Sequence, residues 1–158
     1  MEKSIEVFKW IVAIVGGFIA GALGGMDNLL IFYVVVICAD VVAGTLKGAK
    51  QKNFSSSILF WGLVNKAFEL CIVALMERLD IVLGLNALRN IFIIWFCICN
   101  VASIVENSAV IGVPWPDGLQ KILVQVRKGF SINISKIVKK IIEEYMPIEE
   151  SESDKNED

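Results

Sequence analysis

Four long runs of apolar residues occupy the first two thirds of the chain, and short polar or charged segments separate them. Each run has about the length that an α-helix needs to cross the hydrocarbon core of a bilayer. Hydrophobic residues make up 56% of the 158 residues, which is too apolar for a soluble domain of this size. We therefore predict an all-α integral membrane protein in which residues 1–112 form the transmembrane domain, with spans at about 8–26, 29–46, 58–76 and 88–105.

The pattern changes after Pro114 and Pro116, which end the last apolar run. In residues 117–147, apolar residues recur at helical spacing with lysines and arginines between them, which is typical of a basic amphipathic helix. We expect this region to lie in the cytoplasm, to be broken into two helices near Gly129, and to precede a disordered acidic tail at residues 148–158. The helices either lie on an anionic lipid surface or pack on copies of themselves, and the sequence leaves both open.

Basic residues set the expected orientation. Lys47, Lys50 and Lys52 lie in the segment between the second and third runs and are expected to anchor that loop in the cytoplasm. Four spans then place both termini in the cytoplasm as well, in a multi-pass protein of the bacterial cytoplasmic membrane. A cleaved signal peptide is the weaker interpretation of the first run, because the run is long for a signal core and further spans follow at once.

Small residues repeat along the first run. Ala13, Gly17, Gly21 and Gly25 recur at every fourth position. Such a row lets two helix backbones approach closely in lipid, where the hydrophobic effect does not drive helices together. We predict that the three glycines mediate helix packing or oligomerisation, and the sequence does not decide whether the partner is the same chain or a neighbour.

Three charged residues interrupt the apolar runs. Asp40 lies in the second run, whereas Lys66 and Glu69 lie three residues apart in the third and share a helix face. A charged side chain facing lipid at mid-bilayer costs roughly 2.5–3.5 kcal/mol on insertion scales, so the three are expected to find partners. We predict that Asp40 and Lys66 pair and pin a helical hairpin, and we leave the partner of Glu69 open; lining of a lumen or proton relay is the functional alternative.

The sequence contains no signal for catalysis or cofactor binding. It has no histidine, and its motifs include no phosphate-binding glycine loop, nucleophile with a base, or metal-ligand spacing. The four cysteines all lie in apolar runs, where cysteine is usually a small packing residue. We therefore expect a protein that is not an enzyme and has no cofactor, metal or nucleic-acid partner.

The segment DVVAGTLKGAKQKNFSSSILFWGLVNK, residues 40–66, resembles the core signature of the phage-lysis and toxin-secretion holin family of Gram-positive bacteria and their phages. The later Glu106–Asn107 pair and the GVPWP that follows it also fit, and the resemblance covers roughly residues 8–125. The signature positions are Asp40, Gly44, Lys47, Ser55, Ser56, Gly62 and Lys66.

This resemblance implies a protein that accumulates in the cytoplasmic membrane and oligomerises into lesions. Through such lesions a cell-wall endolysin or a large toxin leaves the cell, without necessarily touching the holin. The partners implied are the lipid bilayer and further copies of the chain. Two alternatives remain: a small proton-coupled transporter acting through Asp40 and Glu69, and an antiholin, which is an inhibitory partner of the same fold.

Overall fold

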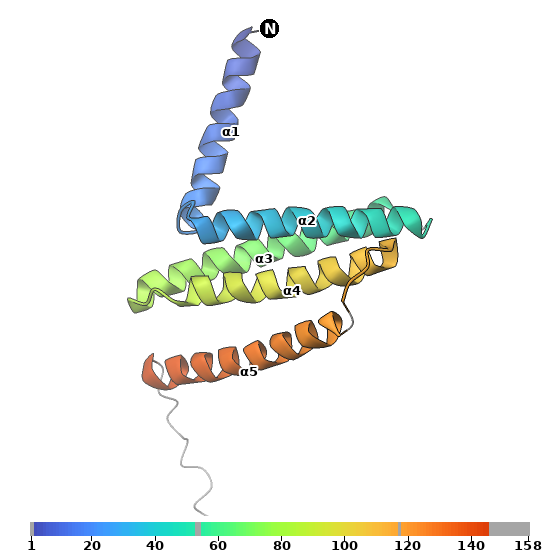
Figure 1. Ribbon diagram of the computed structural model, residues 1–158. Helices are drawn as coiled ribbons and strands as arrows, with labels where there is room; N and C mark the ends of the chain where they lie inside the picture. The colour runs from blue at the N-terminus through green and yellow to red at the C-terminus, as the bar shows by residue number, and fades with distance from the viewer. Residues whose placement is uncertain (1, 53–54, 117, 146–158) are drawn as a thin grey trace, which may run out of the picture.

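The computed structural model describes residues 2–52, 55–116 and 118–145, and the regular structure in these ranges is entirely α-helical (Figure 1). The first four helices are long and apolar enough to cross a membrane, which confirms the predicted fold class. The acidic segment 148–158 lies outside the described residues, so its predicted disorder stays a prediction. The helices are α1 Glu2–Ala22, α2 Asn28–Lys50, α3 Ser56–Leu83, α4 Leu88–Ile111 and α5 Leu119–Tyr145.

Helices α2, α3 and α4 form an up-down-up bundle, in which α4 packs against α2, which runs in the same direction, and against α3, which runs in the opposite direction (Figure 1). A small core joins them, centred on the fully buried Leu30 and Tyr33 of α2, Val73 of α3 and Ile93 of α4. Many large apolar side chains remain exposed on the outer faces of the bundle, among them Phe68, which is 65% exposed. An apolar exterior of this extent is suited to lipid rather than to water.

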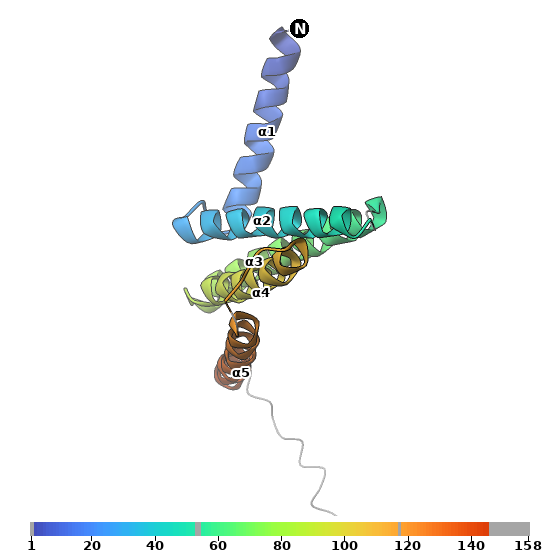
Figure 2. The same ribbon diagram turned by 45° about the vertical axis from the view of Figure 1, so that its right-hand side comes forward.

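Helix α1 projects away from this bundle in both views (Figures 1 and 2). It ends at Ala22, and Gly24 and Gly25 follow with φ angles of +85° and +95°, a conformation that glycine adopts without a Cβ penalty. Gly25 therefore belongs to the turn before α2 and not to the helical face predicted for Gly17 and Gly21. The described side chains of residues 5–22 are all at least partly exposed.

Helices α3 and α4 extend beyond the third and fourth spans predicted from the sequence. The charged segment 77–80 was expected to end the third span, but α3 continues to Leu83 and ends at Gly84, which is in the left-handed region. The reason is that Asp80 is buried and its carboxylate accepts the backbone N–H groups of Leu88 and Arg89, at 3.1 and 2.9 Å. The charged segment thus connects α3 to the start of α4. Helix α4 begins where the fourth span was predicted to begin and extends beyond the predicted end at about residue 105, to Ile111.

Helix α5 is continuous, so the predicted break near Gly129 is wrong. A glycine inside a helix costs roughly 0.5–1 kcal/mol relative to alanine, and the regular apolar pattern on both sides of it outweighs that cost. The helix runs back antiparallel along α4 (Figure 1), and the rings of Phe130 and Trp95 stack with centroids 6.0 Å apart. In this structure the basic helix packs on its own chain, which is neither of the two arrangements considered from the sequence.

Candidate functional site

The three charged residues predicted to find partners within the apolar runs meet in one cluster. Lys66 Nζ lies 2.7 Å from Asp40 Oδ2 and 3.1 Å from Glu69 Oε1. The side chains of Asp40, Lys66 and Glu69 are 9%, 15% and 18% exposed, respectively. The structure therefore brings α2 and α3 together through an ion pair that is largely shielded from the surroundings of the bundle.

Two uncharged residues complete the cluster and add the fourth helix to it. Asn100 of α4 accepts a hydrogen bond from Lys66 Nζ and donates one of 2.9 Å to Glu69 Oε2. The hydroxyl of Tyr33 on α2 donates to the same oxygen at 3.0 Å. Glu69, whose partner was left open, thus receives donors from three helices. Sequence reasoning assigned no role to Tyr33 or Asn100, because a single uncharged polar residue in an apolar run does not identify its partner.

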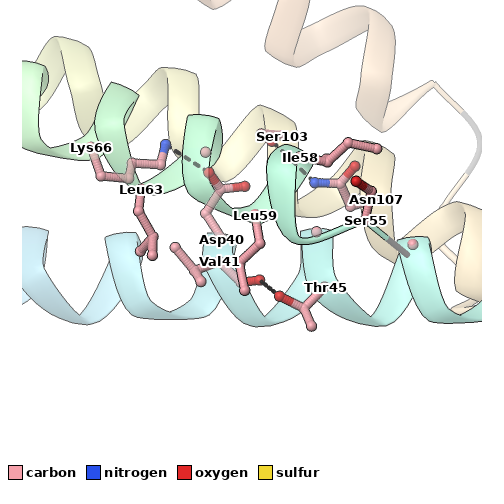
Figure 3. A pocket seen from close by; sticks show the side chains of 13 residues that line it. Asp40, Val41, Thr45, Ser55, Ile58, Leu59, Leu63, Lys66, Ser103 and Asn107 are labelled. Carbon is pink, nitrogen blue, oxygen red and sulfur yellow. Dashed lines mark hydrogen bonds and ion pairs between the residues drawn. The ribbon is translucent and has the colours of Figure 1, made fainter. Parts of the chain in front are cut away.

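A pocket of about 210 Å³ opens beside this cluster, between α2, α3 and α4 (Figure 3). Its inner end is formed by Asp40 and Lys66, and Gly44 and Gly62 lie on its walls. Asn107 of α4 also contributes to it. Several positions of the residue 40–66 signature therefore surround one cavity.

The lysines of the predicted cytoplasmic loop lie at one end of the bundle, and two of them bind the end of α4. Lys47 donates to Asn107 Oδ1 at 3.0 Å, and Lys50 donates to the carbonyl oxygen of Ile111 at 2.6 Å. A cation at this position also interacts favourably with the C-terminal end of the helix dipole. Lys52 is exposed and has a φ of +53° in the turn after α2. Whether the three anchor the loop at a membrane surface stays a prediction.

A second charged cluster lies at the opposite end of the bundle. Arg89 is buried and forms a two-pronged contact with Asp27, with 2.7 Å and 3.2 Å hydrogen bonds from its two terminal nitrogens. Its Nε donates to the carbonyl oxygen of Leu23 at 2.5 Å and lies 3.8 Å from Glu77 Oε2. The hydrogen bonds from Arg89 lower the pKa of Asp27 below its ordinary value. This cluster joins the α1–α2 turn to α4.

No helix packs against the predicted glycine face in the described part of the chain, although Arg78 of α3 donates a 3.3 Å hydrogen bond to the carbonyl oxygen of Gly21. A Cβ placed on Gly17 or on Gly21 would meet nothing within 4 Å. The two glycines are thus open to another molecule, and their predicted role in oligomerisation is not tested by the monomer.

Apolar helices that pack around a shielded polar cluster are the arrangement of a multi-pass membrane protein. The chain belongs to the Bacteriophage holin family, which it matches over residues 17–128. Membership in this family indicates a non-enzymatic membrane protein that associates with the lipid bilayer.

One of the curated relatives is named a probable holin, and others are of uncharacterized function. The chain is 31% identical over 128 residues to a 14.9 kDa Clostridium perfringens protein of uncharacterized function, covering 80% of this chain and 97% of that one. It is 31% identical over 109 residues to the Listeria monocytogenes protein Lmo0128, covering 68% and 78% of the two chains. It is 28% identical over 100 residues to a probable holin of Bacillus phage phi105, covering 63% and 71%. No solved structure matches the chain.

Proposed function

We propose that this protein is a holin of the bacterial cytoplasmic membrane, which oligomerises into lesions that release a cell-wall endolysin or a large toxin. The proposal rests mainly on the exposure of the apolar helix α1. This helix is apolar enough to cross a membrane, yet none of the described side chains in residues 5–22 is buried within the monomer. Gly17 and Gly21 lie open on it. An apolar helix that buries none of these side chains and has small residues at i and i+4 supports association with a further copy of the chain.

In this proposal α2, α3 and α4 are the stable unit that each copy contributes. The contacts of Asp40, Lys66 and Glu69 support a role as the pin of this unit, because most of their polar atoms bind one another or Asn100. A lumen lining would instead leave such groups directed outwards to water. Association through α1 then builds the oligomer without breaking the cluster.

The proposed orientation places the lysine loop and both termini in the cytoplasm, which requires α1 to turn from its position in Figures 1 and 2 and cross the bilayer beside the bundle. Lys47, Lys50 and Lys52 at one end of the bundle support this, because lysine is favoured on the cytoplasmic side. Helix α5 is not among the helices apolar enough to span a membrane, and it carries six basic residues. In the bilayer we therefore place it at the cytoplasmic surface, reached by rotation at Gly112 and Gly118, which both have positive φ. The stack on Trp95 is released in that position.

The experiment is inducible expression of the full chain in bacteria, following membrane potential and the release of a large cytosolic enzyme through time. A holin gives abrupt depolarisation and enzyme release together, after a lag during which copies accumulate. Depolarisation without enzyme release would show that the protein forms a small pore and not a large lesion. Absence of both would contradict the proposal and favour an antiholin or a transporter.

A further inference from the structure

The Asp40 carboxylate has one oxygen without a partner. Oδ2 binds Lys66, whereas Oδ1 is shielded from solvent and has no hydrogen-bond partner among the described residues. Asp40 as a whole is 7% exposed. A buried acceptor left without a donor is unfavourable, and more so when the group is charged. In Figure 3 this oxygen points away from Lys66, towards the part of the pocket beside Leu59 and Ser103.

The charges around this oxygen do not balance. Two carboxylates, those of Asp40 and Glu69, share the single ammonium of Lys66, while Tyr33 and Asn100 contribute only neutral groups. With both acids ionised, the cluster carries one uncompensated negative charge. Unpaired charge is costly inside a membrane protein, so a cation near Oδ1 is favoured.

The lining of the pocket indicates what kind of cation fits. Ile58, Leu59 and Leu63 of α3 form an apolar wall, in which Gly62 leaves room, and Gly44 lines the pocket from α2. In the described part of the chain, no three acidic, cysteine or histidine side chains gather as a metal site would require. The volume of about 210 Å³ is below the roughly 300–1,000 Å³ of sites for drug-sized ligands. A small organic cation with an apolar body suits these walls.

We propose that this pocket binds a primary ammonium group, with the ammonium donating a hydrogen bond to Asp40 Oδ1 and the methylenes next to it lying against the apolar wall. The pocket runs from Asp40 to Gly48 near the end of α2, a length of about 12 Å at about 1.5 Å per residue. It therefore extends towards the lysine end of the bundle, where both a lipid headgroup amine and a free amine have access. The proposal concerns the single chain and does not depend on lesion formation.

The test uses the purified full chain in phosphatidylcholine nanodiscs, with hexylammonium as the probe. Hexanol is the matched neutral ligand, and empty nanodiscs correct for partitioning into lipid. Ligand-observed NMR is expected to show saturable hexylammonium binding about tenfold or more tighter than that of hexanol, as a charge-assisted hydrogen bond requires. Equal binding of the two ligands would overturn the proposal.

Two glycine variants distinguish binding in the pocket from binding elsewhere on the protein surface. Gly62→Leu fills the pocket and leaves Asp40 unchanged, whereas Gly129→Leu introduces the same side chain at an open position of α5. Hexylammonium binding should fall about tenfold or more in the first variant and persist in the second. Unchanged binding by Gly62→Leu would overturn the site. The charge itself is tested by Asp40→Asn, which should abolish the preference for hexylammonium over hexanol.

Changing the lipid of the nanodiscs distinguishes the two possible sources of the ammonium group. Phosphatidylethanolamine carries a primary amine, whereas the headgroup of phosphatidylcholine has no N–H donor. Weaker apparent binding of hexylammonium in phosphatidylethanolamine nanodiscs would assign the pocket to a lipid headgroup. Unchanged binding there would assign it to a free amine, and either result supports the site.

Discussion

Lys66 Nζ lies 2.7 Å from Asp40 Oδ2, and this contact connects the two helices that flank the lysine loop. The same ammonium binds Glu69 and Asn100, so one cation holds groups from α2, α3 and α4. Between apolar helices in lipid there is little hydrophobic driving force, and shared polar contacts contribute specificity. The lysine therefore fixes how the three helices are aligned along their axes.

Charge reversal tests this pairing. Asp40→Lys or Lys66→Asp alone leaves like charges facing each other in a shielded site, and breaking a buried pair in this way costs about 3–5 kcal/mol. Each single variant should accumulate poorly and unfold at lower denaturant concentration in detergent. The double variant restores opposite charges and should recover much of the loss. If the double variant is as unstable as the sum of the singles, the two side chains do not act as a pair.

Gly24 is predicted to tolerate no side chain. Its φ is +85°, and an added Cβ would lie 2.7 Å from the Glu77 carboxylate and 2.8 Å from Arg89 Nε. Gly24→Ala should therefore destabilise the junction between α1 and the bundle, by about 1–3 kcal/mol for the strained backbone alone. Thermal unfolding in detergent measures this, with Gly16→Ala as the control because a Cβ there meets nothing within 4 Å. Equal behaviour of the two variants would contradict the close packing at Gly24.

The contact between Asp27 and Arg89 predicts a dependence of stability on pH. The pKa of Asp27 is lowered from 3.8 in the folded state, chiefly by the hydrogen bonds from Arg89. The stabilisation is therefore complete above that ordinary value and is lost as the pH falls through the folded-state pKa. The melting temperature should drop less between about pH 5 and pH 3 in Asp27→Asn than in the unchanged protein. Glu6→Gln on α1 is the control and should leave the acid-induced drop unchanged.

The alternation of apolar and charged segments was sufficient to predict the membrane helices, because apolar runs of about the length of a bilayer crossing have few other stable locations. It also indicated that Asp40, Lys66 and Glu69 need partners, since lipid makes each of them costly alone. It did not indicate Tyr33 or Asn100, whose hydrogen bonds depend on the rotation of each helix about its axis.

The helix ends were the least predictable part. The third span was predicted to end at about residue 76, but α3 continues past Asp80, which is buried and binds backbone groups at the start of the next helix. That contact spans a nine-residue separation and leaves no periodic signal in the sequence. Gly129 was similarly overestimated as a helix breaker, because one glycine costs less than a turn of helix contributes.

Orientation is tested by cysteine labelling in a variant that lacks the four native cysteines. Ser135→Cys on α5 should react with an impermeant maleimide in inside-out vesicles and not in intact cells, because the proposed position of α5 is cytoplasmic. Asn86→Cys, in the exposed turn between α3 and α4, is the matched control and should react only from outside. Labelling of Ser135→Cys from the outside would show that α5 follows α4 across the membrane.

The central claim is that copies of this chain alone open lesions large enough for a folded protein. The most direct measurement is release from lipid vesicles that contain a small dye and a folded enzyme, with purified protein added at increasing density. We predict that dye and enzyme leave together above a threshold density, and that Gly21→Leu raises this threshold whereas Gly129→Leu does not. Release of dye without enzyme at every density, or of neither, would contradict the assignment of the chain as a lesion-forming holin.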